Sequence, residues 1–249
     1  MSIFDEPKID CHNHVFDPAG FPYRPDTPYR PSGQEVSTAK QFRHVMDCYG
    51  VQYALVVGPN SGYSTDSSPV FDAIDRSNGR CKGISVVRLD IPTKELADLK
   101  ARGIVGIAFN STIDGVEYYL GAHDLLARLA DLDMILQIQA EKDQLAEFHS
   151  LLANSPVRIA IDHCGRPDIS AGLGAPGFQA LLEAFTTAGC VWASDWPFVK
   201  ATERIDYGPL LKLFESFVPD PADRRKILWD TPCRWFGFPA SNAQIGRTS

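Results

Sequence analysis

The sequence predicts an α/β protein folded as a TIM-like (β/α)8 barrel, and three observations lead to that fold class. Apolar runs of about four to eight residues alternate with helical patterns along most of the chain, which is typical of parallel strands joined by helical crossovers. No glycine-rich phosphate loop accompanies the strands, which disfavours a doubly wound sheet. The length of 249 residues suits one barrel with a large core. We therefore expect a single domain over residues 1–239 and a polar, disordered tail over residues 240–249.

Strands and helices follow one another from the amino terminus. The first strand, KIDCHNHVF, leads into a proline-rich loop at residues 17–33, whose length is typical of lids and binding loops. The next helix ends at Gly50, a glycine suited to a carboxyl-terminal cap, and the helix after it has Pro69 near its start. The strands are predicted at residues 8–16, 53–59, 81–88, 106–111, 134–140, 158–163 and 190–195. The helices are predicted at residues 38–50, 67–79, 92–103, 123–133, 142–155, 177–185 and 207–218.

One strand is missing from this pattern, because a (β/α)8 barrel needs eight strands and the sequence supplies seven. The short interval lies between the strands at residues 158–163 and 190–195, which a single helix separates. Two explanations stay open: the barrel lacks one β/α unit, or a segment between about residues 186 and 190 is absent from this sequence. In either case the missing strand leaves unpaired backbone groups along two strand edges.

The composition, 44% hydrophobic and 22% charged, is that of an ordinary soluble globular protein. A formal net charge of -7 and a pI near 5.3 argue against nucleic acid or an anionic membrane as partner, although a few local arginines can still bind a small anion. We see no secretory signal, and no run of about 18 apolar residues predicts a membrane span. Six scattered cysteines without a CxxC pair indicate reduced thiols, so we expect a cytoplasmic protein.

The first strand carries three ionisable side chains at alternate positions, Asp10, His12 and His14. Successive side chains of a strand point to opposite faces, so we expect these three on one face and Cys11 and Asn13 on the other. Two histidines on one face of a buried strand need polar partners. Asp10 lies deeper along the strand and is a candidate to orient one of the histidines.

Polar residues also collect where the other strands end, and the active sites of such barrels lie at the carboxyl ends of the strands. The strands at residues 158–163 and 190–195 end with His163 and Asp195. Three histidines and one aspartate, all able to bind a metal ion or move protons, are thus expected to converge. The remaining polar candidates near strand ends are Asn110, Ser111, Gln137, Gln139 and Arg166.

Other residues of these types have a simpler structural explanation. Strand alternation turns Asp162 and Cys164 away from the face of His163, so we interpret both as structural. Trp196 and Pro197 are expected to shape the wall of the site. A lone histidine on a helix is more often an ordinary surface or core residue than a catalyst, which applies to His44, His123 and His149.

Four motifs together resemble the amidohydrolase superfamily, in the metal-dependent-hydrolase-like branch that includes 2-pyrone-4,6-dicarboxylate lactonase and sugar lactonases. The motifs are DCHNHVF at the start, DHCGRPD in the middle, SDWPF late and ILWDTPCRWFGF near the end. HxH alone is a weak signal, but HxH followed by DHCGRPD and SDWP in this order is specific. The resemblance covers nearly the whole chain, from Lys8 to Phe238.

The resemblance implies roles for the four converging residues. Asp195 resembles the aspartate that acts as general base on the hydrolytic water. His12, His14 and His163 resemble histidines that bind zinc in metal-using relatives. In the pyrone lactonase the corresponding histidines polarise the lactone carbonyl without any metal.

The positions that contact substrate in that lactonase are matched only in part. Arg166 and Tyr29 match such positions, but Ala108 stands in place of an arginine and Gln137 in place of a tyrosine. Two arginines suit a dicarboxylate, so the loss of one leaves the exact substrate open. The expected substrate-binding residues are Arg166, Tyr29, Asn110, Ser111 and Gln137.

The predicted function is hydrolysis of a small anionic lactone, of the pyrone-dicarboxylate or sugar-lactone kind, by a monomer or homodimer. Asp195 activates water, and the histidines donate to the oxygen on which negative charge develops. Neither a lysine nor a glutamate is placed to bridge two metals, and Gln139 is uncharged, so we favour a site that needs no metal. The alternative is one divalent ion such as Zn²⁺ on His12, His14 and either His163 or Asp195.

Two other functions stay open. The first is a zinc-dependent hydrolase or decarboxylase of the same superfamily, which bound metal in the purified protein would distinguish. The second is a barrel that has lost a unit and only binds a ligand or a partner, which the short interval before Cys190 suggests. The complete set of one base and three donors argues against this second alternative.

Overall fold

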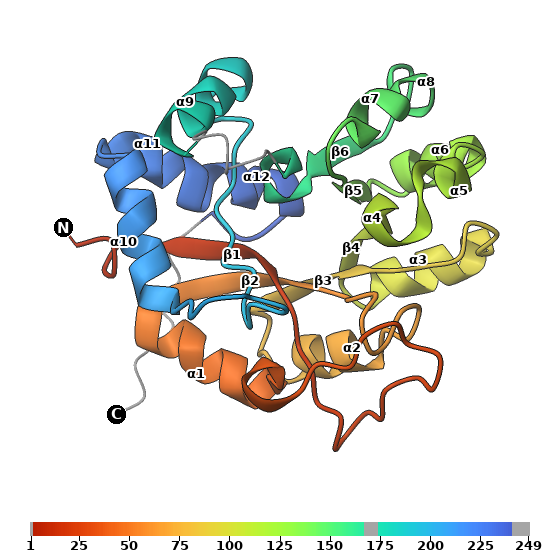
Figure 1. The fold of residues 1–249 in the computed structure, drawn as a ribbon, viewed down its shortest axis with the longest axis horizontal. Helices are drawn as coiled ribbons and strands as arrows, with labels where there is room; N and C mark the ends of the chain where they lie inside the picture. The colour runs from red at the N-terminus through yellow and green to blue at the C-terminus, as the bar shows by residue number, and fades with distance from the viewer. Residues whose placement is uncertain (1, 167–173, 241–249) are drawn as a thin grey trace.

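A parallel sheet of six strands forms the centre of the protein, whose computed structural model describes residues 2–166 and 174–240. The strand order follows the chain, every neighbouring pair is parallel, and the sheet curls into an open half-barrel (Figure 1). The α/β fold of successive parallel strands is therefore confirmed. The strands are β1 (Lys8–Asn13), β2 (Val51–Val57), β3 (Cys81–Ser85), β4 (Ile104–Asn110), β5 (Ile135–Gln139) and β6 (Arg158–Ile161).

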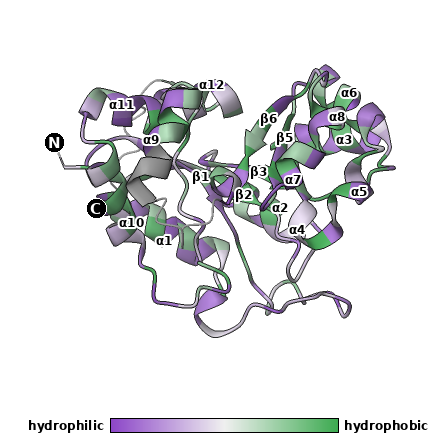
Figure 2. Cartoon of the chain, turned by 45° about the horizontal axis from the view of Figure 1, so that its top comes forward, coloured by the Kyte–Doolittle hydropathy of each residue, from purple (hydrophilic) through white to green (hydrophobic). Residues whose placement is uncertain are grey.

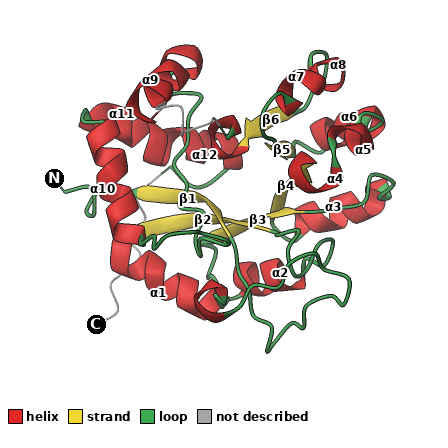
Figure 3. Cartoon of the chain, viewed as in Figure 1, coloured by secondary structure: helices red, strands yellow, loops and turns green. Residues whose placement is uncertain are grey.

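Helices surround the sheet (Figure 3). The helices between the strands are η1 (Gly33–Glu35), α1 (Ala39–Tyr49), α2 (Ser68–Asp75), α3 (Thr93–Ala101), α4 (Ser111–Asp114), α5 (Val116–Tyr119), α6 (His123–Asp131), α7 (Gln144–Glu147) and α8 (His149–Leu152). The helices after β6 are η2 (Asp162–Gly165), α9 (Gly174–Phe185), α10 (Tyr207–Phe217), α11 (Pro221–Arg225), the π-helical η4 (Lys226–Asp230) and α12 (Thr231–Phe236).

Both faces of the sheet are buried, as a barrel wall requires. On β5, Ile135 belongs to one apolar cluster with Trp229, whereas Leu136 and Ile138 belong to a second cluster with residues of the surrounding helices. Close strand approach depends on Gly106, because a Cβ atom there would lie 2.7 Å from the carbonyl oxygen of Ile135. Successive side chains of β5 therefore pack into two apolar layers, one beneath the outer helices and one on the opposite face of the sheet.

The carboxyl-terminal helices lie at the amino-terminal ends of the strands. The Nζ atom of Lys82, early in β3, donates to the carbonyl oxygens of Phe236 and Gly237, both at 2.8 Å. The guanidinium of Arg158, at the start of β6, donates to the carbonyl oxygen of Trp235 at 2.8 Å. The segment 226–238 thus covers this end of the sheet and leaves the opposite end, where the strands terminate, for a site.

The seventh predicted strand, residues 190–195, is an irregular segment beside β1 rather than a regular strand, and Asp195 at its end has a φ of 57°. The backbone N–H of Cys11 donates to the carbonyl oxygen of Trp192 at 3.1 Å, and the N–H of Asp195 donates to that of His12 at 2.9 Å. Within the described residues, β6 pairs with β5 alone, and no strand lies between β6 and this segment. The six-strand sheet is therefore open on that side, as the missing β/α unit predicts.

Most predicted helices are present, with local differences. Helix α1 ends at Gly50, whose φ of 68° is the left-handed cap conformation that the sequence predicts. The single helix predicted over residues 142–155 is divided into α7 and α8, which meet at the fully buried Phe148. The short helices α4 and α5 were not predicted, because four-residue helices carry no detectable periodicity.

The helix ribbons alternate between hydrophilic and hydrophobic residues, as expected for helices that cover a core with one face (Figure 2). Within residues 2–166 and 174–240, no helix is long and apolar enough to cross a membrane. Residues 241–249 of the predicted tail, and Pro167 and Asp168 of the DHCGRPD motif, lie outside the described residues.

Candidate active site

The ionisable residues singled out in the sequence meet at the carboxyl ends of the strands. His12 and His14 come from the end of β1, His163 from the turn after β6, and Asp195 from the irregular segment beside β1. Asp162, which precedes His163, joins them. These five side chains form the histidine cluster, and every one has a polar atom or ring within about 5 Å of His12.

Local backbone geometry delivers these side chains to one place. The pairing of β1 with β2 has a register shift between Asp10 and Asn13, so simple alternation fails there. Strand β6 ends at Ile161, and the turn that follows holds His163 and Cys164 at φ values of 51° and 56°. A left-handed backbone is costly for residues other than glycine and is often found at functional sites.

His12 is the centre of the cluster, with a side chain only 7% exposed. Its Nδ1 atom lies 3.2 Å from Asp162 Oδ1, and its Nε2 atom lies 3.1 Å from His14 Nε2. Burial opposes the charged form of His12, but the carboxylate of Asp162, together with those of Asp195 and Asp10, outweighs burial and raises the pKa of His12 to about 9. At neutral pH the ring is therefore a cation enclosed by polar groups.

His14 is fixed through its other nitrogen. Its Nδ1 donates to the carbonyl oxygen of Val57, at the end of β2, at 2.7 Å. Because a carbonyl only accepts hydrogen bonds, this contact places a proton on Nδ1 and directs Nε2 toward His12 and Asp195. His14 Nε2 lies 3.5 Å from Asp195 Oδ1.

Asp195 lies opposite the two histidines, with its Oδ1 also 3.8 Å from His12 Nε2. Partial burial opposes ionisation, but the contact with His14 and the positive charge of His12 hold the pKa of Asp195 well below its usual range. Its side chain is 46% exposed, so solvent reaches the carboxylate. The arrangement presents an ionised, accessible carboxylate beside two imidazoles.

His163 completes the group, with its ring centroid 5.1 Å from that of His12. Burial and the positive charge on His12 lower the pKa of His163 below its ordinary value. Both effects favour the neutral form of the His163 imidazole.

Asp10 does not contact an imidazole, contrary to the expectation from strand alternation. Its buried carboxylate accepts from Ser194 N at 3.0 Å, from Ser194 Oγ at 2.6 Å and from Tyr207 Oη at 2.9 Å. Burial raises the pKa of Asp10, and these donors, together with the backbone N–H of His12 at 3.4 Å, stabilise its charge. Asp10 therefore ties β1 to the segment that carries Asp195 and to α10, and it contacts the backbone of His12 rather than its imidazole.

Asp162 was expected from alternation to face away from His163 and to be structural, and the expected orientation is wrong. The carboxylate accepts a hydrogen bond from Gln137 Nε2 at 2.6 Å and contacts His12. Alternation does not apply because the strand has already ended at Ile161.

The predicted substrate-binding residues are dispersed around the strand ends. Gln137 contacts Asp162 and His12, and the exposed Arg166 follows the turn that carries His163. Asn110 Nδ2 donates to Gln139 Oε1 at 2.9 Å, and Ser111 Oγ donates to the carbonyl oxygen of Gln139 at 2.9 Å. The hydroxyl of Tyr29, in the proline-rich loop, donates to the Glu35 carboxylate.

Residues without a predicted chemical role mostly lie apart from the cluster. Cys164 is an exposed residue, but its sulfur is partly buried, and this burial raises the pKa of the thiol. A raised pKa disfavours the thiolate, which is the nucleophilic form of cysteine. Trp196 stacks on Phe42 of α1 with ring centroids 5.2 Å apart. The histidines without a predicted chemical role lie on helices: His44 in α1, His123 in α6 and His149 in α8.

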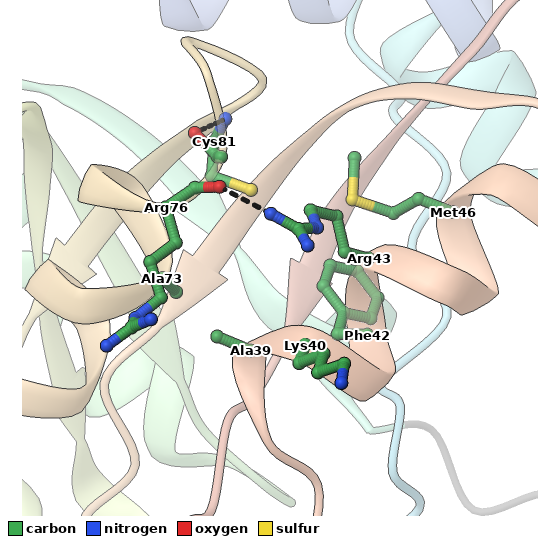
Figure 4. Close-up of a pocket in the computed structure, with 9 residues that line it drawn as sticks. Ala39, Lys40, Phe42, Arg43, Met46, Ala73, Arg76 and Cys81 are labelled. Atoms are coloured by element: carbon green, nitrogen blue, oxygen red, sulfur yellow. Dashed lines mark hydrogen bonds between the residues drawn. The ribbon is translucent and has the colours of Figure 1, made fainter. Parts of the chain in front are cut away.

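A small pocket of about 110 Å³ between α1 and α2 lies away from the histidine cluster (Figure 4). Two of its cationic groups have partners: Arg43 donates to the carbonyl oxygen of Arg76 at 2.9 Å, and Arg76 pairs with Asp72 at 2.6 Å. Burial raises the pKa of Cys81, at the edge of the pocket, to about 12. This pocket therefore lacks the acid–base chemistry of the histidine cluster.

The histidine cluster has the donors that a divalent ion requires. His12, His14 and Asp195 offer ligand atoms within 4.8 Å of one another, and so do His12, Asp162 and His163. The second nitrogens of His12 and His14 contact a carboxylate and a carbonyl, as is usual for histidines that bind metals. The residues therefore fit one ion such as Zn²⁺.

A curled parallel sheet with histidines and aspartates at its carboxyl-terminal edge is typical of the α/β-barrel hydrolases. A family model described as amidohydrolase matches residues 9–189 and 170–238. The chain therefore belongs to the amidohydrolase family. The two matched stretches overlap in the region where the sequence predicts a missing unit.

Two curated relatives are similar over much of the chain. A 4-sulfomuconolactone hydrolase of Rhizobium radiobacter is 30% identical, over 92% of this chain and 89% of the relative. A 2-pyrone-4,6-dicarboxylate hydrolase of Comamonas testosteroni is 27% identical, over 74% of this chain and 60% of the relative. The first alignment spans 275 positions, more than the 249 residues here, so the relative carries residues that have no counterpart in this chain.

Solved structures share the fold. A probable 2-pyrone-4,6-dicarboxylic acid hydrolase of Acinetobacter baumannii, crystallised with citric acid, superposes with a TM-score of 0.80 at 23% identity, over 93% of this chain and 99% of that one. An amidohydrolase of Burkholderia multivorans with bound zinc superposes with a TM-score of 0.58 at 16% identity, over 93% of this chain and 99% of that one.

Proposed function

We propose that this protein is a lactone hydrolase that opens the ring of a small anionic lactone. The observation that carries the proposal is the convergence of the ionised, accessible Asp195 carboxylate with His12 and His14, all within 3.8 Å. Hydrolysis of an ester needs a base for water and hydrogen-bond donors for the developing oxyanion, and this group supplies both.

The substrate class is supported by the relatives. Both are named as hydrolases of lactones that carry acidic groups, a sulfonate in one case and two carboxylates in the other. Arg166 is exposed next to the His163 turn, where its cation can bind such a group. Tyr29, Asn110, Ser111 and Gln137 remain the other proposed substrate contacts.

In the proposed reaction, Asp195 accepts a proton from water while the water oxygen forms a bond to the lactone carbonyl carbon. His12 donates to the carbonyl oxygen as it becomes an oxyanion, with His163 as a second donor, while His14, whose Nε2 faces Nε2 of His12, orients that ring. The oxyanion then collapses, the ring C–O bond breaks, and the proton on Asp195 passes to the leaving oxygen. Each donor of this kind contributes about 3 kcal/mol to lowering the barrier.

The complete base-and-donor set supports a reaction without a metal. The fit of the cluster to one ion, and the zinc in a relative of the same fold, favour a metal-assisted hydrolase as the second candidate. His12, His14 and Asp195 would hold such an ion, with His163 as a fourth ligand. A divalent ion bound there would polarise the carbonyl and lower the pKa of water.

The test is hydrolysis of a panel of sulfonated, carboxylated and sugar lactones by chelator-treated protein, with Asp195→Asn beside it. We expect turnover to survive chelation and to fall about 10²- to 10⁴-fold in the variant, because the amide cannot accept the proton. Activity that chelation abolishes and Zn²⁺ restores would establish the second candidate instead. A wild-type protein that opens none of the lactones would refute both.

A further inference from the structure

The hydrogen bonds around His12 indicate where the protons lie on the ring nitrogens of His12 and His14. His14 Nδ1 donates to Val57, so the 3.1 Å contact between the Nε2 atoms of His12 and His14 holds a single proton. On the other side, Asp162 Oδ1 lies 3.2 Å from His12 Nδ1. A carboxylate only accepts hydrogen bonds, so this contact places a proton on Nδ1. In the other tautomer Nδ1 would accept from Gln137 Nε2 at 3.0 Å, but Nδ1 and Asp162 Oδ1 would then be two acceptors 3.2 Å apart.

The contact with Gln137 supports the assignment of Asp162 as a hydrogen-bond acceptor. Its Nε2 donates to the same Oδ1 atom at 2.6 Å and lies 3.0 Å from His12 Nδ1. If the amide were rotated by half a turn, its Oε1 would face the carboxylate oxygen at that distance, with two acceptors in contact. The observed orientation therefore directs two donors, the amide and the imidazole, to one oxygen.

All three groups are buried, which makes this arrangement rigid. His12 is 5% exposed, Asp162 9% and Gln137 4%, so water does not compete for these hydrogen bonds. They come from β1, the turn after β6, and β5. The ring of His12 is thereby held between elements that are distant in sequence, with Nε2 directed toward Asp195.

We propose that Asp162, held by Gln137, is a positioning residue that fixes the His12 ring with its proton on Nδ1 and its Nε2 directed at the reacting carbonyl. The inference rests on the proposed lactone hydrolysis and deepens it. Asp162 touches no reacting atom: it lies on the far side of His12 from Asp195, so it acts through the imidazole.

The kinetic test compares Asp162→Asn with Glu6→Gln. Glu6 is a matched control because its carboxylate is also buried, at 8% exposure, and pairs with Arg224 at 2.6 Å before β1 begins. We expect Asp162→Asn to lower kcat about 10- to 100-fold with little change in KM, and Glu6→Gln to lower stability without changing kcat. An equal loss of kcat in both variants, or an unchanged kcat in Asp162→Asn, would overturn the proposal.

A measurement independent of activity separates this proposal from the proposed function. In protein labelled with ¹⁵N-histidine, the ring nitrogens of His12 are assigned by comparison with His12→Gln. We expect a protonated Nδ1 in the wild type and in Glu6→Gln, and an altered Nδ1 signal in Asp162→Asn. A ring signal that is identical in all three proteins would refute the positioning role even if lactones are hydrolysed. A wild type without lactonase activity would refute the function while this measurement still decides the role of Asp162.

If Asp162→Asn does not fold, Gln137→Met replaces it, because methionine keeps the length of the side chain and removes the donor to Asp162. We expect the same change in the ring signal and a smaller loss of kcat. Wild-type values in both measurements would overturn the proposal that Asp162, held by Gln137, fixes the His12 ring.

Discussion

Replacing Ser194 by alanine removes one oxygen atom that joins β1 to the segment carrying Asp195. Ser194 Oγ donates to Asp10 Oδ2 at 2.6 Å and accepts from the backbone N–H of Trp196 at 3.0 Å. Ser194 is 4% exposed and Asp10 is fully buried, so water cannot replace either bond without rearrangement. The substitution therefore acts on the residues on both sides of Asp195.

The expected cost follows from these two contacts. A hydrogen bond to a charged group is worth about 1.5–3 kcal/mol, and a buried N–H left without a partner costs about 1–3 kcal/mol. Ser194→Ala should therefore lower the free energy of unfolding by about 2.5–6 kcal/mol. Since Asp195 is the next residue, we also expect kcat to fall, by up to about 10²-fold for a displacement near 1 Å.

Tyr207→Phe is the matched variant, because Tyr207 donates to the same oxygen of Asp10 from α10. It should cost about 1.5–3 kcal/mol of stability and leave kcat unchanged. Urea unfolding followed by tryptophan fluorescence gives the stabilities, and steady-state hydrolysis of the preferred lactone gives kcat. If kcat falls equally in both variants, or is unchanged in Ser194→Ala, the bond from Ser194 to Asp10 does not position Asp195.

Two further outcomes are expected. Burial opposes the charge on His12, but Asp162 raises its pKa to about 9, above the ordinary value of about 6.5. The stability from this ion pair is complete below about pH 6.5 and is lost as the pH rises through about 9, so urea midpoints should fall across this range in the wild type and less in His12→Gln. Gly106→Ala should lower the urea midpoint by an amount equivalent to about 1–3 kcal/mol, because its Cβ would meet the carbonyl oxygen of Ile135 at 2.7 Å; an unchanged midpoint would contradict that packing.

The openness of the sheet bears on both the fold and the site. Ile161 at the end of β6 is 40% exposed and Val191 beside β1 is 37% exposed, whereas the strands between them are largely buried. Even so, His163 and Asp195, which flank the opening in sequence, both reach His12. The missing unit therefore leaves the histidine cluster assembled.

Local patterns in the sequence determined the strands, most helices and four members of the site. Apolar runs predict β2 and β5 because a buried parallel strand needs apolar residues on both faces. His12 and His14 are evident from their spacing, and His163 and Asp195 from their positions at strand ends. Each of these signals is contained within a few consecutive residues.

Only the tertiary structure decided the roles of Asp162, Ser194 and Tyr207. Asp162 enters the site because β6 ends one residue earlier and a left-handed turn follows, which alternation cannot foresee. Ser194 and Tyr207 meet Asp10 across 184 and 197 residues of sequence. A buried carboxylate must be satisfied by whichever donors the fold brings to it, and no local pattern of residues specifies which donors those are.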